Sequence, residues 1–158
     1  MSLEGRIFSI VELLLLGLTL GITVFLAYWT ARLNQKVLTL RASEEFAEKD
    51  NANQAALERV LGASIFLHDK IDVEQIRRLE ENPEHRLCLL TYLNHYESLA
   101  RGINMGIYAG EVFQVARKSL IIREFQLWED YITDYRHRRK RPLAWSEFER
   151  LVKRWAPT

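Results

Sequence analysis

One apolar run restricts what this chain can fold into more than any other feature. Residues from Leu13 to Trp29 include no charged side chain, and no later segment reaches that length without one. A helix needs about 20 predominantly apolar residues to cross the ~30 Å hydrocarbon core of a bilayer. Counted from Ile7, the apolar region reaches that length. The sequence therefore predicts one transmembrane helix over residues 7–29.

A signal peptide and a buried core helix both fit the apolar run less well than a membrane span. A cleavable signal peptide has an apolar region of about 7–15 residues, followed by small residues at the cleavage site. This run is longer, and residues 28–32, at its end, offer no such site. A buried core helix would rarely be followed by a polar extension that carries Arg32, Lys36 and Arg41. We therefore favour a membrane span.

The distribution of charge predicts the orientation of the span. Arg6 is the only Lys or Arg residue before the apolar run, whereas Arg32, Lys36 and Arg41 follow the run closely. Because an excess of Lys and Arg marks the cytoplasmic side, we expect a single-pass protein of the bacterial inner membrane with a cytoplasmic C-terminal domain. The single cysteine, Cys88, is typical of a reducing compartment and excludes an internal disulfide.

Beyond the span, the apolar pattern predicts an all-α fold: one N-terminal transmembrane helix plus a cytosolic helical bundle. We expect a helical stalk over residues 30–50 and a cytosolic helical domain over residues 51–158. Asp50 to Asn53 are typical helix-capping residues and predict a break. Helical spacing then predicts helices over about 53–68, 72–82, 83–103, 111–137 and 144–155. No alternating strand pattern competes with them.

Two sets of residues within the span suggest self-association. Gly17 and Gly21 lie on one helix face and favour close helix packing, so they are candidate oligomerisation residues, although glycine is common in such helices. Glu12, Thr19 and Thr23 also share a face and are candidate pore-lining residues. Alternatively, Glu12 reaches the headgroup water, and the threonine hydroxyls bond to the preceding helical turn.

A basic run near the end of the fourth of these predicted helices is the main candidate ligand site. Its five positive charges stand out in a chain whose formal net charge is only +1. Such a cluster can bind the phosphates of a nucleotide or RNA, or anionic lipid headgroups. The alternative is a solvated helix end that the helix macrodipole favours. The candidate phosphate-binding residues are Arg136, Arg138, Arg139, Lys140 and Arg141.

A second polar group lies on the helix predicted over residues 83–103. Asn94, Glu97 and Arg101 share one face of that helix. Glu97 and Arg101 form a favourable pair four residues apart, which by itself accounts for their spacing. A polar interface or a ligand site on this face is the other interpretation.

No motif in the sequence predicts catalysis. There is no Gly-rich phosphate loop, no His-Glu-x-x-His segment and no ligand spacing between any two of the four histidines. Arg78 and His85 match the loose Arg-x6-His pattern of HEPN ribonucleases, but Pro83 breaks the helical setting of that pattern. We therefore expect a protein that is not an enzyme, with no catalytic residue, no metal and no cofactor.

The C-terminal half resembles an uncharacterised bacterial family of single-span membrane proteins with a helical cytosolic domain. The resemblance rests on residues 93–97, the glycine turn at residues 102–112, the Trp128-x-x-Tyr131-Ile132 segment and the ending at residues 148–155. It departs at His95, where the family tends to have an aromatic residue. The resemblance implies an architecture and assigns no chemistry.

A looser likeness is to the small membrane effectors that accompany CRISPR systems. It rests on size, topology and the pairing of a polar face in the span with a basic cluster, and it implies a role in phage defence. We therefore expect a homo-oligomeric membrane effector that senses a cyclic oligoadenylate or RNA and gates or perturbs the membrane. The alternative is a membrane tether whose helical domain docks a cytosolic protein.

Overall fold

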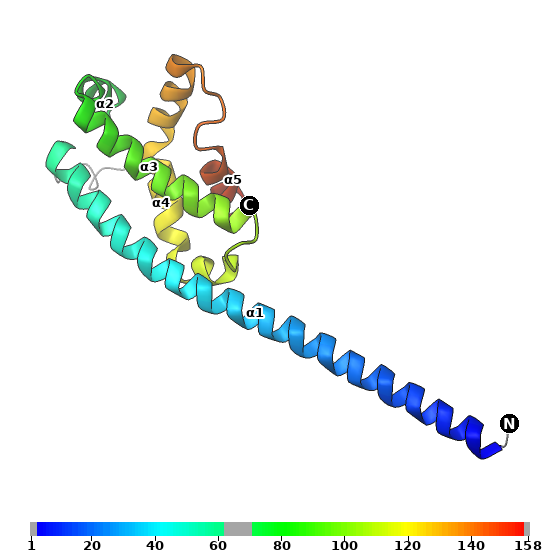
Figure 1. Ribbon diagram of the computed structural model, residues 1–158. Coiled ribbons are helices and arrows are strands. Elements are labelled where there is room, and N and C mark those ends of the chain that lie inside the picture. The colour runs from blue at the N-terminus through cyan, green and yellow to red at the C-terminus, as the bar shows by residue number, and fades with distance from the viewer. Residues whose placement is uncertain (1–2, 62–70, 157–158) are drawn as a thin grey trace. The chain divides into compact units, whose positions relative to one another are not determined.

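The chain is helical throughout the part that the structure describes. The computed structural model describes residues 3–61 and 71–156, and it describes side chains from Glu12 onward except those of residues 61, 75 and 79. The described residues form no strand, which confirms the all-α expectation (Figure 1). The helices are α1 (Leu3–Leu61), α2 (Val73–Glu80), α3 (Pro83–Asn104), α4 (Gly110–Arg139) and α5 (Ser146–Trp155).

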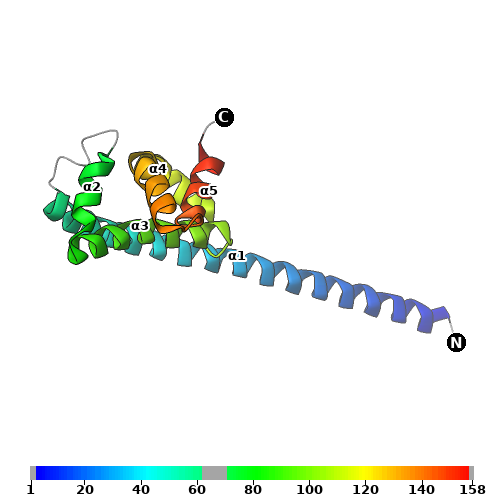
Figure 2. The ribbon, with the colours of Figure 1, turned by 90° about the horizontal axis from the view of Figure 1, so that it is seen from above.

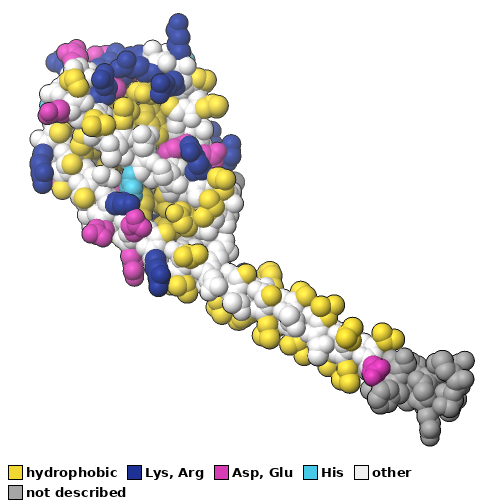
Figure 3. Space-filling view, viewed as in Figure 1, with side chains coloured by type: hydrophobic (Ala, Val, Ile, Leu, Met, Phe, Trp, Pro, Cys, Tyr) yellow, Lys and Arg dark blue, Asp and Glu magenta, His cyan; other side chains and the backbone are white. Residues whose placement is uncertain are grey.

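The chain divides into two compact units, Met1–Val37 and Leu38–Thr158. The first unit holds the N-terminal part of α1, in which every side chain from Glu12 to Asn34 is exposed. Hydrophobic side chains cover this segment in the space-filling view (Figure 3). By length and composition, α1 is a helix that could cross a membrane.

The predicted break at Asp50–Asn53 is wrong, because α1 continues through it to Leu61. The side chain of Asp50 is buried in the second unit, and Leu57, two turns later, is completely buried. Tertiary packing therefore keeps this segment helical in spite of its capping residues. The end of the helix predicted over residues 53–68 lies outside the described residues.

The remaining predicted helices are confirmed, and their ends have clear causes. Asp72 Oδ1 accepts a hydrogen bond of 2.9 Å from the backbone N–H of Glu74, at the start of α2. Asn82 Oδ1 accepts one of 2.9 Å from Glu84 N, and Pro83 occupies the first turn of α3. Both side chains satisfy backbone donors that a helix N-terminus leaves free.

Two glycines shape the turn between α3 and α4. Gly106 has φ +72°, a conformation that side chains rarely adopt. Gly102 lies so close to the ring of Tyr108 that a Cβ at this position would clash with it. The predicted glycine turn is therefore both a backbone requirement and a packing requirement.

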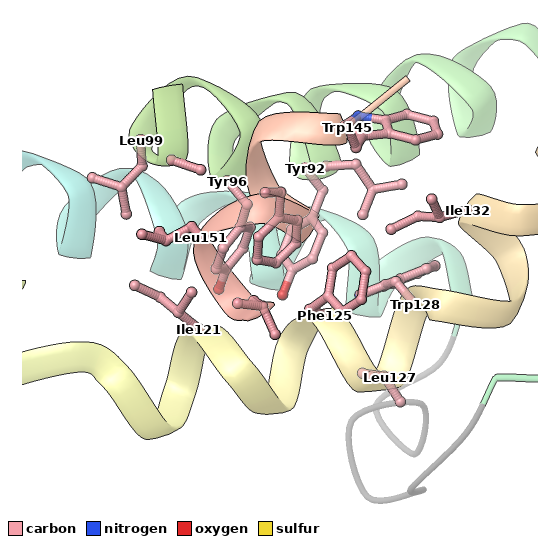
Figure 4. Close-up of a cluster of buried hydrophobic side chains, with 14 of the residues drawn as sticks. Tyr92, Tyr96, Leu99, Ile121, Phe125, Leu127, Trp128, Ile132, Trp145 and Leu151 are labelled. Atoms are coloured by element: carbon pink, nitrogen blue, oxygen red, sulfur yellow. The ribbon is translucent and has the colours of Figure 1, made fainter. Parts of the chain in front are cut away.

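The core of the second unit surrounds α3, which packs against α2, α4 and α5. Tyr92 and Tyr96 of α3 are buried, and Figure 4 shows their rings beside Phe125 and Trp128 of α4. Phe148 of α5 stacks on Tyr96 with a ring-centroid separation of 5.1 Å. Along α4, five apolar side chains at helical spacing are buried: Ile121, Phe125, Trp128, Ile132 and Tyr135.

One buried carboxylate opposes the stability of this core at neutral pH. Asp50 is only 5% exposed, and its Oδ1 has no hydrogen-bond partner within the described residues. Burial raises the pKa of Asp50 above its usual value, although Tyr96, Arg117 and Arg123 act in the opposite direction. Because desolvation penalises the ionised form, the folded protein binds this proton more tightly than the unfolded chain.

Replacing Asp50 with asparagine is therefore expected to raise the free energy of unfolding at pH 7. A raised pKa means that the contribution of Asp50 is fully present below its unfolded pKa and is lost as the pH rises through its folded pKa. The difference between Asp50→Asn and the natural protein should shrink as the pH is lowered toward about 4. Denaturant unfolding at both pH values measures it. A variant that is less stable at pH 7 would contradict a destabilising role for the ionised carboxylate.

Candidate functional site

The structure divides the basic run between two environments. Arg136 Nη1 donates to Glu149 Oε2 at 2.8 Å, and Arg136 Nε donates to the carbonyl oxygen of Ala144 at 2.8 Å. Arg138 Nη2 donates to Glu80 Oε2 at 2.7 Å. These two arginines are therefore held by carboxylates of the domain itself.

The other three cations of the run point to solvent. Within the described residues, Arg139, Lys140 and Arg141 form no ion pair, and all three are exposed. Figure 3 shows Lys and Arg side chains gathered at the end of the domain where α4 ends in Figure 1. Their availability to a phosphate-bearing ligand agrees with the expectation, and binding itself stays a prediction.

The chain reverses direction directly after α4. Lys140 adopts the left-handed conformation with φ 53° and caps the helix. The backbone N–H of Arg141 then donates to the carbonyl oxygen of Arg136 at 3.1 Å, which closes the turn. Arg141 therefore leaves the axis of α4 and lies at the start of the segment that leads to α5.

This turn forms one wall of a groove between α3 and the segment that leads into α5, which we call the α3–α5 groove. Its volume is about 490 Å³. Arg141 from the basic run and Asn94, Glu97 and Arg101 from α3 share it, so the two polar groups singled out in the sequence meet there. The lining residues are Leu90, Asn94, Glu97, Arg101, Tyr135, Arg141, Pro142, Leu143, Ala144 and Trp145.

Trp145 gives the groove an aromatic wall in a fixed orientation. Its backbone is left-handed, with φ 54°, which is uncommon for a bulky residue. Its Nε1–H donates to Asn94 Oδ1 at 3.0 Å, and its ring centroid lies 4.7 Å from that of Tyr135. Figure 4 shows the indole lying against α3. Strained backbone of this kind persists where surrounding contacts hold it, and it is enriched at functional sites.

Glu97 serves the fold more than the groove. Its carboxylate accepts hydrogen bonds from Phe148 N at 2.8 Å and Glu147 N at 3.3 Å, at the first turn of α5. No side chain at the start of α5 caps that helix, so Glu97 replaces the missing cap. The expected pairing with Arg101 is present at 3.8 Å. Glu97 therefore serves both α5 and Arg101, and Arg141 is the cation of the groove that forms no ion pair among the described residues.

The groove is suited to a ligand with a negative charge. Guanidinium groups bind phosphate oxygens in a fork-like geometry, whereas Trp145 is only 4% exposed and belongs to the core behind the groove. The lining contains neither a histidine, a cysteine, a serine nor a lysine.

Comparison with known protein families identifies the family of this chain. Residues 18–155 match the family described as Domain of unknown function (DUF4760). The chain belongs to this family. A family without an assigned function agrees with the resemblance found in the sequence, whereas the likeness to CRISPR-associated effectors stays a prediction. No curated protein and no solved structure matches the chain.

The DUF4760 match begins inside the apolar segment, where the structure describes the candidate pore and oligomerisation residues. The hydroxyl of Thr19 donates to the carbonyl oxygens of Leu15 at 3.0 Å and Leu16 at 2.9 Å, and that of Thr23 donates to Thr19 O at 2.8 Å. These are the intrahelical bonds that the alternative interpretation expected. Glu12 is exposed.

Gly17 and Gly21 both have open space beside them. A Cβ added at either position would meet no atom within 4 Å. That face of α1 therefore contacts no other described part of the chain. Self-association and pore formation stay predictions.

A second polar cluster of the DUF4760 domain was not found by sequence reasoning. Glu80, at the end of α2, is buried and accepts hydrogen bonds from Tyr131 at 2.6 Å and Arg138 at 2.7 Å. Asp134 joins Arg138 to Arg77. Arg77 and Arg138 hold the pKa of Asp134 below its usual value. The cluster ties α2 to α4. The pair of Asp134 and Arg138, four residues apart, is visible in the sequence, but Glu80 lies more than 50 residues from Tyr131 and Arg138, so no spacing signals its place in the cluster.

The ribonuclease pattern has no structural support. Arg78 lies in α2 and His85 lies in α3, and Asn82, between them in the sequence, caps the start of α3. The two side chains therefore do not share one helix, as that family's motif requires.

Proposed function

We propose that this DUF4760 protein is a non-enzymatic membrane effector whose helical domain receives a phosphate-bearing ligand in the α3–α5 groove. The observation that carries the proposal is the groove itself, whose lining includes the guanidinium groups of Arg101 and Arg141. A nucleotide or an RNA segment carries the phosphate groups that such guanidinium groups bind.

Membrane anchorage is the second part of the proposal. The exposed apolar segment of α1 supports it, because an isolated helix of this composition is stable in hydrocarbon rather than in water. The positive charges at Arg32, Lys36 and Arg41 support a single-pass protein of the bacterial inner membrane whose helical domain lies in the cytoplasm. The open face at Gly17 and Gly21 supports homo-oligomerisation through the span.

Charge reversal at Arg141 tests the groove. Full-length Arg141→Glu, purified in mild detergent, is expected to bind cyclic oligoadenylate, ATP or a short RNA at least about tenfold more weakly than the natural protein, because one charge-assisted phosphate contact becomes repulsive. Equilibrium binding to each of these probes measures the effect, and the tightest of them identifies the ligand class.

Arg139→Glu is the matched control for this experiment. Arg139 belongs to the same basic run and is exposed, but it does not line the α3–α5 groove. Arg139→Glu should lose less than about threefold in binding affinity, since only the screened long-range attraction between this residue and the ligand changes. Equal losses in both variants would replace the groove with a diffuse basic surface. No binding by the natural protein would remove the sensor function and favour a tether that docks a cytosolic protein.

A further inference from the structure

The turn between α3 and α4 exposes two large apolar side chains. Met105 is 68% exposed and Ile107 is 57% exposed. The turn is nevertheless well defined, because Met105 N donates to Arg101 O at 2.9 Å and Ile107 N donates to Gly102 O at 2.9 Å. Gly106, between the two side chains, has the positive φ that makes the turn tight. Met105 and Ile107 are therefore exposed on an ordered turn whose backbone conformation is fixed by hydrogen bonds.

This turn is fastened to α1 at a defined residue. The backbone N–H of Ala109 donates to Thr39 Oγ1 at 2.8 Å, and both residues are buried. The ring of Tyr108 packs over Gly102. Met105 and Ile107 are thereby held on the part of the domain that contains Thr39.

Four exposed apolar residues belong to the two segments that the hydrogen bond between Thr39 and Ala109 joins. In the described part of Leu38–Thr158, seven large apolar side chains are exposed, and four of them are Leu38, Leu40, Met105 and Ile107. The other three, Leu87, Val115 and Leu143, lie singly on α3, on α4 and in the segment before α5. Scattered exposed residues are ordinary, whereas a cluster marks an interaction surface.

The neighbouring sequence indicates what kind of surface covers the cluster. Thr39 follows Trp29, the last residue of the apolar run, by only ten residues in the sequence. The sequence between Glu12 and Glu44 has no acidic residue and carries Arg32, Lys36 and Arg41. Basic residues with adjacent exposed apolar side chains are what an anionic bilayer surface attracts.

We infer that the cluster formed by Leu38, Leu40, Met105 and Ile107 contacts the lipid surface, and that Met105 and Ile107 enter the boundary between headgroups and acyl chains. The inference rests on the proposed membrane span, because the span brings the cluster to the bilayer. The contact would fix the domain on the membrane through a second point besides α1.

Depth-dependent fluorescence quenching tests the contact in the full-length protein. Cys88→Ser removes the native thiol, and Ile107→Cys then carries a polarity-sensitive fluorophore in vesicles of phosphatidylcholine and phosphatidylglycerol. A nitroxide near the lipid headgroups is expected to quench this label at least about twofold more than a label at Leu143→Cys, because interfacial groups penetrate only ~5–10 Å. Leu143 is the matched control, since it is equally apolar and 77% exposed.

A third label separates this inference from the proposed span. Leu20→Cys lies in the middle of the apolar run and should be quenched by a nitroxide near the bilayer centre. Quenching at residue 20 without quenching at residue 107 would overturn the surface contact and leave the span intact. No quenching at residue 20 would overturn both. Met105→Cys serves as a second reporter if the Ile107→Cys protein loses its helical circular dichroism.

Discussion

Replacing Arg138 with alanine is expected to lower the free energy of unfolding by about 3 kcal/mol, because it leaves a buried carboxylate without its cation. Glu80 is the residue affected, since its side chain is 3% exposed and, within the described residues, Arg138 is the only arginine with which it forms an ion pair. Tyr131 would still donate one hydrogen bond to Glu80, which keeps the loss below that of a fully orphaned charge. Denaturant unfolding in mild detergent, followed by circular dichroism, measures it.

Arg139→Ala is the matched control for this prediction. Arg139 is adjacent and exposed, and it forms no ion pair in the described part of the chain, so its removal should change stability by less than about 0.5 kcal/mol. The effect of Arg138→Ala should also diminish in acid. Because the pKa of Asp134 is lower in the folded protein than in the unfolded chain, ionised Asp134 stabilises the fold at pH values above the ordinary aspartate pKa. This stabilisation is lost as the pH falls through the lowered pKa of the folded protein. Equal destabilisation by both variants would contradict a specific role for Arg138.

Replacing Trp128 with alanine is expected to lower the free energy of unfolding by about 3–5 kcal/mol, the usual range for deleting a large aromatic side chain from a core. Trp128 is completely buried. Its ring contacts that of Tyr92, with centroids 5.8 Å apart, and that of Tyr131, with centroids 6.1 Å apart. The cavity would therefore open between α3 and α4. The same denaturant experiment measures the loss.

Trp128→Phe separates lost volume from lost polarity. The indole N–H of Trp128 is buried without a hydrogen-bond partner among the described residues. Phenylalanine removes this unsatisfied donor together with part of the ring, so we expect a loss of less than about 2 kcal/mol. A Phe variant as unstable as the Ala variant would show that the N–H has a partner that stabilises the core.

Local sequence signals predicted most of the helices. Asp72, Asn82 with Pro83, and the glycines around residue 106 act within a few residues of themselves, so their effect is visible in the sequence. The same reasoning failed at Asp50, because the burial of that carboxylate and of Leu57 depends on helices that follow later in the chain. Local propensity was overridden by tertiary packing there.

The candidate site was predicted only in part. The sequence singled out the basic run and the polar face of α3, but it did not show that Arg141 and Asn94 share a groove. It also did not separate Arg138 from Arg139: Asp134, four residues before Arg138, was a visible partner, but the buried Glu80 that also binds Arg138 lies 58 residues away. The role of Glu97 as the cap of α5 was equally hidden, since a pair with Arg101 already accounted for its position.

The place of α5 in the core has a consequence for biosynthesis. Its ten residues are too few to form a stable helix alone, and its first turn depends on a carboxylate of α3. Phe148, Leu151 and Trp155 complete the core, yet they are synthesised after all the helices that they contact. The apolar N-terminal segment therefore leaves the ribosome while the domain is still unfinished, and a nascent chain halted before Phe148 would expose the aromatic face of α3 to chaperones.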